Sequence, residues 1–140
     1  MTETTVASFI LGGLIFLSGA VLMSIARSAA AGRLGRSAFA GIRTSATTAS
    51  DEAWRAAHER AVVPYWWGGA VSLVAGLAMI ALGFTMVNGS ISEATGDQIL
   101  LALVVPAMLG MLGFVCYGGL VGYRAARQVN ATANNIGEKK

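Results

Sequence analysis

The chain has 140 residues, of which 55% are hydrophobic and only 12% are charged, against about 25% charged residues in an ordinary soluble domain. Small soluble domains leave much of their surface in water, so a soluble chain of this length has no way to hide so much apolar surface. This composition excludes a soluble globular protein. The net charge of +3 comes from basic residues that flank apolar runs, a pattern that indicates membrane topology rather than nucleic-acid binding.

The first apolar run covers residues 6–26 and contains no charged side chain. At 1.5 Å per residue, a helix of this length covers about 30 Å, the thickness of a bilayer core. The residues before the run include no Lys or Arg, so the basic start of a secretory signal is missing. We therefore expect a retained membrane helix rather than a cleaved signal peptide.

Residues 51–62, between the first two runs, have the pattern of a short amphipathic helix. The residues that recur at i, i+3, i+4, i+7 and i+8, and so share one face, are Trp54, Ala57, His58, Ala61 and Val62. Ser50 is a good N-cap, and Asp51 and Glu52 suit the positive N-terminus of a helix. We expect a helix of about 12 residues that lies in the membrane interface, with Trp54 directed toward lipid.

The stretch before this helix, residues 41–48, gathers hydroxyl groups around one guanidinium group. Arg43 can clamp a carboxylate or a phosphate through two N–H groups, and Thr44, Thr47 and Thr48 can bind the same anion or cap a turn. The alternative is a loop that satisfies its own backbone, with Arg43 paired to a nearby acid or a lipid headgroup. The residues alone favour the second interpretation, and both stay open.

The second apolar run covers residues 65–87 and the third covers residues 99–123. The second run begins after Pro64, which suits the first turn of a helix, and Pro106 is expected to kink or loosen the third helix. The aromatic side chains at the ends of these runs are typical headgroup-level anchors: Tyr65, Trp66, Trp67 and Tyr123. The polar tail, residues 124–140, is expected to be loose past Arg127.

The basic residues indicate the orientation of the three helices. All ten fall within residues 27–64 and 124–140, and the tail ends in Lys139 and Lys140, while the turn at 88–98 has two acids and no basic residue. Three spans put both basic segments on one side, which the positive-inside rule makes cytoplasmic. We expect a single membrane domain with its N-terminus outside, and with the loop 27–64 and the C-terminus in the cytoplasm.

Small residues recur along the second run and mark a face for close helix packing. The positions at spacings of four and seven are Gly68, Ser72, Gly69, Gly76 and Gly83. One interpretation is a tight three-helix bundle. The other is that part of this strip receives another chain.

Several chemistries are not favoured by this sequence. No Asp, Glu, Lys, Arg or His lies inside the three runs, although proton relays and ion pathways normally need such a group. No nucleophile–base pair and no paired carboxylates occur, so we expect no enzyme and no cofactor. Cys116 is the only cysteine, which excludes an intrachain disulfide and a cysteine-based metal site. His58 has no second His or Cys nearby, so we expect a packing residue and no metal.

One motif in the loop carries a family resemblance. Its residues stand in the pattern G-x-R-T-x-x-T-x6-W-x3-H and are Gly41, Arg43, Thr44, Thr47, Trp54 and His58. This pattern resembles the signature of the SdpI family of bacterial membrane proteins, over about residues 8–125. The chain is similar to one three-helix module of the longer immunity proteins in that family. The resemblance implies a bacterial cytoplasmic membrane and protection against a secreted, membrane-active peptide, with a link to signalling.

Two functions follow from these observations. In the first, the chain binds a peptide toxin or a lipid-linked target through the motif loop and the small-residue helix faces. In the second, it is an accessory or scaffold subunit that docks onto a larger membrane protein through the strip in the second run. The expected partners are therefore the lipid bilayer and a peptide toxin, another membrane protein or a second copy of the chain, and nucleic acid is not expected.

Overall fold

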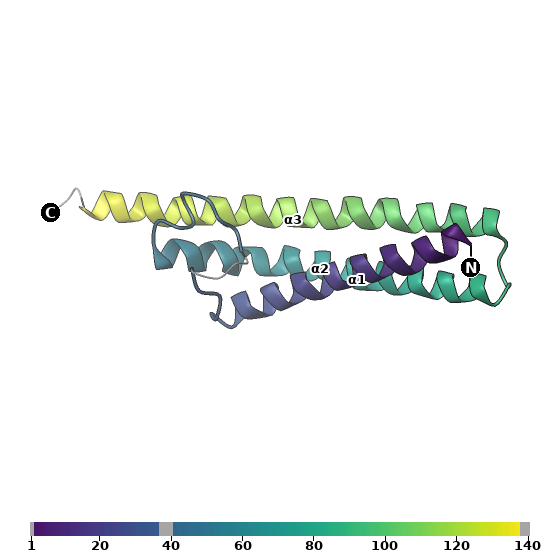
Figure 1. Cartoon of the computed structure of the whole chain (residues 1–140). Helices are drawn as coiled ribbons and strands as arrows, with labels where there is room; N and C mark the ends of the chain where they lie inside the picture. Colours follow the sequence, from purple (N-terminus) through teal and green to yellow (C-terminus); the bar gives the residue numbers. More distant parts are fainter. Residues whose placement is uncertain (1, 37–40, 138–140) are drawn as a thin grey trace. The chain divides into compact units, whose positions relative to one another are not determined.

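The computed structural model describes residues 2–36 and 41–137, which form three α-helices (Figure 1). Helix α1 spans Glu3–Ala30, α2 spans Asp51–Val87 and α3 spans Glu93–Gly137. The described residues contain no strand, and all three helices are long and apolar enough to cross a membrane. The predicted class, an all-α membrane protein with three transmembrane helices, is confirmed. Lys139 and Lys140, which the charge count includes, lie outside the described residues.

The helices bury little of their apolar surface inside the protein. In the most apolar window of α1, α2 and α3, the buried share is 22%, 28% and 11%. Side chains such as Leu17, Leu109 and Leu112 are about 60% exposed. Burial of apolar surface is worth about 25 cal/mol per Å², so a chain that leaves this much uncovered needs lipid around it.

The internal contacts divide the chain into two compact units, each with a segment of every helix. The first unit comprises Met1–Leu22 and Gly68–Gly113, and the second comprises Met23–Trp67 and Phe114–Lys140. All ten basic residues of the sequence belong to the second unit, whereas the charged residues of the first unit are all acidic. The two units therefore differ sharply in charge.

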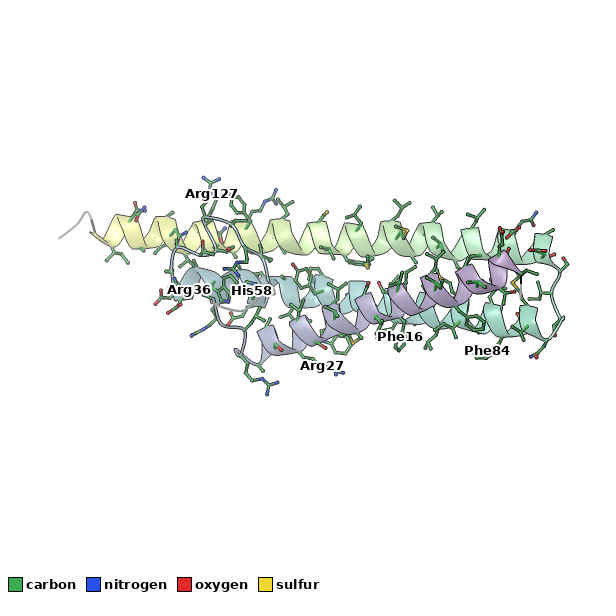
Figure 2. The ribbon with its side chains drawn as sticks, in the orientation of Figure 1. Phe16, Arg27, Arg36, His58, Phe84 and Arg127 are labelled. Atoms are coloured by element: carbon green, nitrogen blue, oxygen red, sulfur yellow. The ribbon has the colours of Figure 1, made fainter. Side chains whose placement is uncertain are left out.

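The core of the first unit is apolar and draws on all three helices. Its buried residues are Ile15 from α1, Met79, Leu82 and Met86 from α2, and Leu100 and Ala107 from α3. The ring of Phe9 meets the ring of Phe84, labelled in Figure 2, edge to face at a centroid distance of 5.1 Å. The Thr4 hydroxyl also donates a hydrogen bond to the Asp97 carboxylate, which links α1 to α3.

Glycines bring the backbones of α1 and α2 into close contact in the first unit. A Cβ atom on Gly76 would lie 2.6 Å from the backbone nitrogen of Phe16, and one on Gly19 would lie 2.8 Å from the carbonyl oxygen of Gly69. No real Cβ atom fits at such distances from backbone atoms. Only glycine allows the two helices to approach this closely.

Two further small residues continue the same contact. Ser72 is fully buried, and its hydroxyl donates to the carbonyl oxygen of Gly68 at 2.8 Å. A Cβ atom on Gly83 would lie 2.9 Å from the ring of Phe9 on α1. In the first unit, α1 therefore covers much of the small-residue strip of α2.

Helix α2 begins earlier than the sequence predicts. Residues 51–63 are not a separate interfacial helix but the first turns of α2, so the expected position of Pro64 in a first turn is wrong. Pro64 lies inside α2 and Pro106 lies inside α3. A proline deprives the carbonyl four residues earlier of its helical donor, a loss that membrane helices tolerate when neighbouring groups compensate.

Helix α3 also extends further than predicted. It continues to Gly137, so the expectation of a loose chain past Arg127 is wrong. Ala126 and Val129 pack against residues of α2 and of the preceding loop in the second unit. The side-chain amide of Asn130 donates to the carbonyl oxygen of Ala46 at 2.9 Å. These contacts hold the start of the extension in a helix.

Candidate functional site

The connection between α1 and α2 folds back onto the start of α2, within the second unit (Figure 1). His58, one turn after Trp54 on α2, anchors it, and its side chain is only 3% exposed. The backbone N–H of Ile42 donates to Nε2 of His58 at 2.9 Å, so this nitrogen carries no proton. The proton therefore sits on Nδ1, which donates to the carbonyl oxygen of Trp54 at 2.8 Å.

Both nitrogens of His58 are thus engaged while the imidazole ring is neutral. The ring lies before the apolar run that starts at Tyr65, and burial there lowers its pKa below the ordinary value of 6.5, with the bond to the Trp54 carbonyl acting in the opposite direction. A protonated ring would be a donor at both positions and would lose the bond from Ile42. The loop therefore packs on α2 only while the His58 ring is neutral.

Gly41 makes the close approach of the loop to His58 possible. Its φ is 126°, a conformation that L-residues rarely adopt, and a Cβ atom there would run into the imidazole ring. Both the backbone conformation and the lack of space beside His58 therefore require glycine at position 41.

The two motif threonines form a turn that fixes the next stretch of the loop. Thr47 is fully buried, and its Oγ1 donates to the carbonyl oxygen of Ile42 at 2.7 Å. The same Oγ1 accepts the backbone N–H of Thr44 at 2.9 Å, while the hydroxyl oxygen of Thr44 accepts the N–H of Thr47 at 3.2 Å. Thr48 adds a bond from its hydroxyl to the Thr44 carbonyl at 2.8 Å. Of the sequence alternatives, these contacts match a loop that satisfies its own backbone.

Trp54 holds the first part of the connection. It is 3% exposed, its indole N–H donates to the carbonyl oxygen of Leu34 at 2.7 Å, and its ring lies 4.2 Å from the His58 ring by centroids. The expectation that Trp54 faces lipid is therefore wrong. The apolar face that the spacing predicts does exist, but the connection and its neighbours cover it, and Trp54, Ala57, His58 and Ala61 are all buried.

Arg36 also contributes to this arrangement and was not singled out from the sequence. Arg36 pairs through Nε with the Asp51 carboxylate at 2.9 Å and donates from Nη1 to the carbonyl oxygen of Thr48 at 3.3 Å. The predicted N-cap is confirmed, since the N–H of Ala53 donates to Oγ of Ser50 at 3.0 Å. Nothing in local spacing points to the Arg36 pair, because its partner Asp51 is the first residue of α2 and lies 15 positions further along the chain.

Helix α3 also packs against the loop and the start of α2. A Cβ atom on Gly122 would lie 2.5 Å from the side chain of Ile42 and 2.7 Å from the carbonyl oxygen of Ala57. The apolar positions Ala126, Val129, Ala133 and Ile136 recur at helical spacing and are a signal that could have predicted this part of α3.

Arg43 is the one exposed residue of the motif. Gly41, Thr44, Thr47, Trp54 and His58 hold the loop on α2 through the contacts above. We call this arrangement the loop clamp. Arg43 lies between them in sequence, and its side chain is exposed at the surface. The predicted packing residues Gly68, Ser72, Gly69, Gly76 and Gly83 belong to the first unit and form no part of the loop clamp.

The described residues contain no group of three or more His, Cys, Asp or Glu side chains that could hold a metal ion. Cys116 is exposed on α3. Every buried side-chain nitrogen and oxygen in the described part of the chain has a hydrogen-bond partner. The loop clamp is therefore an internally satisfied structural element.

Three apolar helices and a clamped connection define the class: a small multi-pass membrane protein of helical architecture. A family model of the SdpI/YfhL protein family matches residues 33–118, which is more than half of the chain and includes the whole motif. The chain belongs to the SdpI/YfhL family. This is not a known enzyme family. Searches of curated proteins and of solved structures found no match to the chain.

Proposed function

We propose that this chain protects a bacterial cell against a membrane-active peptide, and that Arg43 is the residue through which the motif loop recognises it. The observation that carries the proposal is a difference in burial among the six motif residues. Five of them hold the loop, and the sixth, Arg43, is exposed. A motif built this way fixes the backbone around one surface arginine.

The chemistry of that group indicates the ligand. A guanidinium group presents a planar fork of N–H donors that suits a carboxylate, and a charged hydrogen bond is roughly twice as strong as a neutral one. A peptide with a free C-terminus or an acidic side chain supplies this partner. Because the loop clamp fixes the backbone on both sides of Arg43, little backbone entropy is lost when the peptide binds.

The charge distribution supports an orientation for this model. All ten basic residues belong to residues 27–64 and 124–140, and the positive-inside rule places both segments in the cytoplasm of a three-span protein. The N-terminus and the turn at 88–98 then lie outside the cytoplasmic membrane. In this arrangement Arg43 meets a peptide that has already crossed or entered the bilayer.

The test uses the bacterium that carries this gene, in one strain with the gene deleted and in another with it restored. Cells are challenged with synthetic amphipathic peptides in matched pairs, one with a free C-terminal carboxylate and one amidated, and membrane depolarisation and growth are measured. We expect the restored gene to raise tolerance to a carboxylate peptide, and Arg43→Ala to lose this tolerance while Arg60→Ala, another exposed arginine, keeps it. Equal tolerance with and without the gene, across the whole panel, would overturn the proposal.

The accessory-subunit alternative places a partner on the small-residue strip of α2. Contacts with α1 at Gly69, Gly76 and Gly83 leave this alternative without a favouring observation. We therefore propose only the protective function.

A further inference from the structure

A small cavity lined by Arg36 and Arg55 lies beside the loop clamp in the second unit. Its volume is about 170 Å³, which leaves room for several water molecules. The residues that matter most in its lining are Gly32, Arg36, Asp51, Trp54, Arg55 and His58. Figure 2 shows Arg36 and His58 next to each other at the start of α2. We call it the arginine cavity.

The described residues that line the arginine cavity carry excess positive charge. They include two arginines, Arg36 and Arg55, and one acid, Asp51. Arg36 is held by Asp51 at 2.9 Å and by the carbonyl oxygen of Thr48 at 3.3 Å, contacts that use two of the five N–H donors of a guanidinium group. Among the described residues, Arg55 has no carboxylate within salt-bridge distance. One arginine is thus already fixed in position, and a second is not paired with a described acid.

Trp54 and His58 also line the arginine cavity, but their polar atoms are already engaged. The indole N–H of Trp54 is bonded to Leu34, and both nitrogens of His58 are bonded to backbone groups. Among the described lining residues, the charged side chains are therefore the groups left to recognise a ligand.

We propose that the arginine cavity binds a phosphoryl oxyanion, either free phosphate or the phosphate group of a soluble monoester, between Arg36 and Arg55. A tetrahedral oxyanion presents oxygens to two guanidinium forks at once, which a planar carboxylate does less well. The exposed pair between Arg36 and Asp51 is weak enough for the anion to share Arg36, because such surface pairs are worth about 1 kcal/mol or less. This site is separate from Arg43 and does not depend on the proposed protective function.

The position of the cavity along α2 favours a soluble ligand over a lipid headgroup. Arg55 lies ten residues before Tyr65, where the second apolar run starts, which corresponds to about 15 Å along the helix axis. The headgroup layer on each side of a bilayer is only about 5–8 Å thick. A phosphate next to the start of the apolar run would therefore not reach Arg55.

The test uses the full-length chain in a maltoside detergent, which carries no phosphate. Inorganic phosphate is titrated at constant ionic strength, and binding is followed by ³¹P NMR line broadening and by tryptophan fluorescence. We expect saturable binding that Arg55→Gln weakens by at least about tenfold, as for the loss of a charged hydrogen-bonding pair, and that Arg55→Lys restores only in part. The matched control is Arg60→Gln on the same helix, outside the cavity, with an affinity within about twofold of wild type.

A second arm replaces phosphate with short-chain phosphatidylglycerol. If this lipid binds with the same dependence on Arg55 and phosphate does not, the cavity binds a phosphoryl group but the proposal of a soluble ligand is overturned. No saturable binding of either probe, or equal weakening by Arg55→Gln and Arg60→Gln, would overturn the site itself. Circular dichroism of each variant establishes that it is folded. Neither result changes what is expected for the peptide tolerance of the Arg43→Ala variant.

Discussion

The hydroxyl group of Thr47 is the most heavily used polar group of the loop clamp, and Thr47→Val removes it with almost no change of shape. Its Oγ1 donates to the carbonyl oxygen of Ile42 at 2.7 Å and accepts the N–H of Thr44 at 2.9 Å, in a side chain that is fully buried. Each buried group left without a partner costs about 1–3 kcal/mol. Ile42 and Thr44 are only half-buried, so we take the lower end for each and expect about 2 kcal/mol in total.

Limited trypsin digestion measures this loss directly, because the exposed Arg43 lies in the clamped stretch. Cleavage of the bond after Arg43 requires the loop to open, and its rate follows the population of the open form when closing is fast. A change of about 2 kcal/mol corresponds to roughly 30-fold faster cleavage, quantified by mass spectrometry of the fragments. The control is Thr48→Val, since the Thr48 hydroxyl is exposed and makes one bond, to the Thr44 carbonyl.

Thr48→Val should change the rate at this bond by no more than about threefold, as for an exposed hydrogen bond of about 0.5 kcal/mol. Equal acceleration by Thr47→Val and Thr48→Val would refute the reasoning. It would mean that general loosening of the connection, and not the buried hydroxyl, controls access to Arg43.

Three further predictions test other parts of the structure. Because burial lowers the pKa of His58, the open loop takes up a proton first as the pH falls below 6.5. The clamp should therefore be at full stability above that pH and weaken below it. NMR should show this as a falling protection factor of the Ile42 amide, which is bonded to the ring, and a protection factor independent of pH would contradict it. Gly76→Ala should lower the free energy of unfolding in detergent by about 1–3 kcal/mol relative to Gly113→Ala, because a Cβ on Gly76 meets backbone at 2.6 Å and one on Gly113 meets nothing within 4 Å. Both changes add the same helix propensity, so equal stability of the two variants would contradict the close packing. Trp54→Phe keeps a ring beside His58 but removes the indole donor. It should raise the amide hydrogen-exchange rate of residues 31–36 by about fivefold, as for a lost hydrogen bond of about 1 kcal/mol. An unchanged exchange rate would show that the indole N–H does not hold these residues.

The sequence predicts much of the fold because membrane helices leave a strong local signal. Each apolar run is long enough to span a bilayer, and the runs at 6–26, 65–87 and 99–123 all fall inside helices of the structure. The helix boundaries were less predictable. Pro64 resembles a helix start, and the polar residues after Arg127 resemble a loose tail, yet both lie within helices because contacts elsewhere in the second unit stabilise them.

The candidate site was predicted only in part. The motif spacing identified Gly41, Thr47, Trp54 and His58 as a group, but could not say which of them face solvent. Trp54 has the pattern of a lipid-facing anchor, and its burial depends on Leu34, 20 residues away in sequence. The arginine cavity was not predicted, since Arg36 and Arg55 lie on different segments and share no local pattern.

The sequence by itself determined that this is a membrane protein, that it has three helices long and apolar enough to span a bilayer, and that it belongs to the SdpI/YfhL family. These properties are local, because apolar length and residue spacing act along a single helix or turn. Tertiary structure decided which motif residues are buried and that Arg43 is exposed. These properties depend on contacts between residues separated by 16 to 84 positions, such as Ile42 with His58 and Ala46 with Asn130, which only the folded chain brings together.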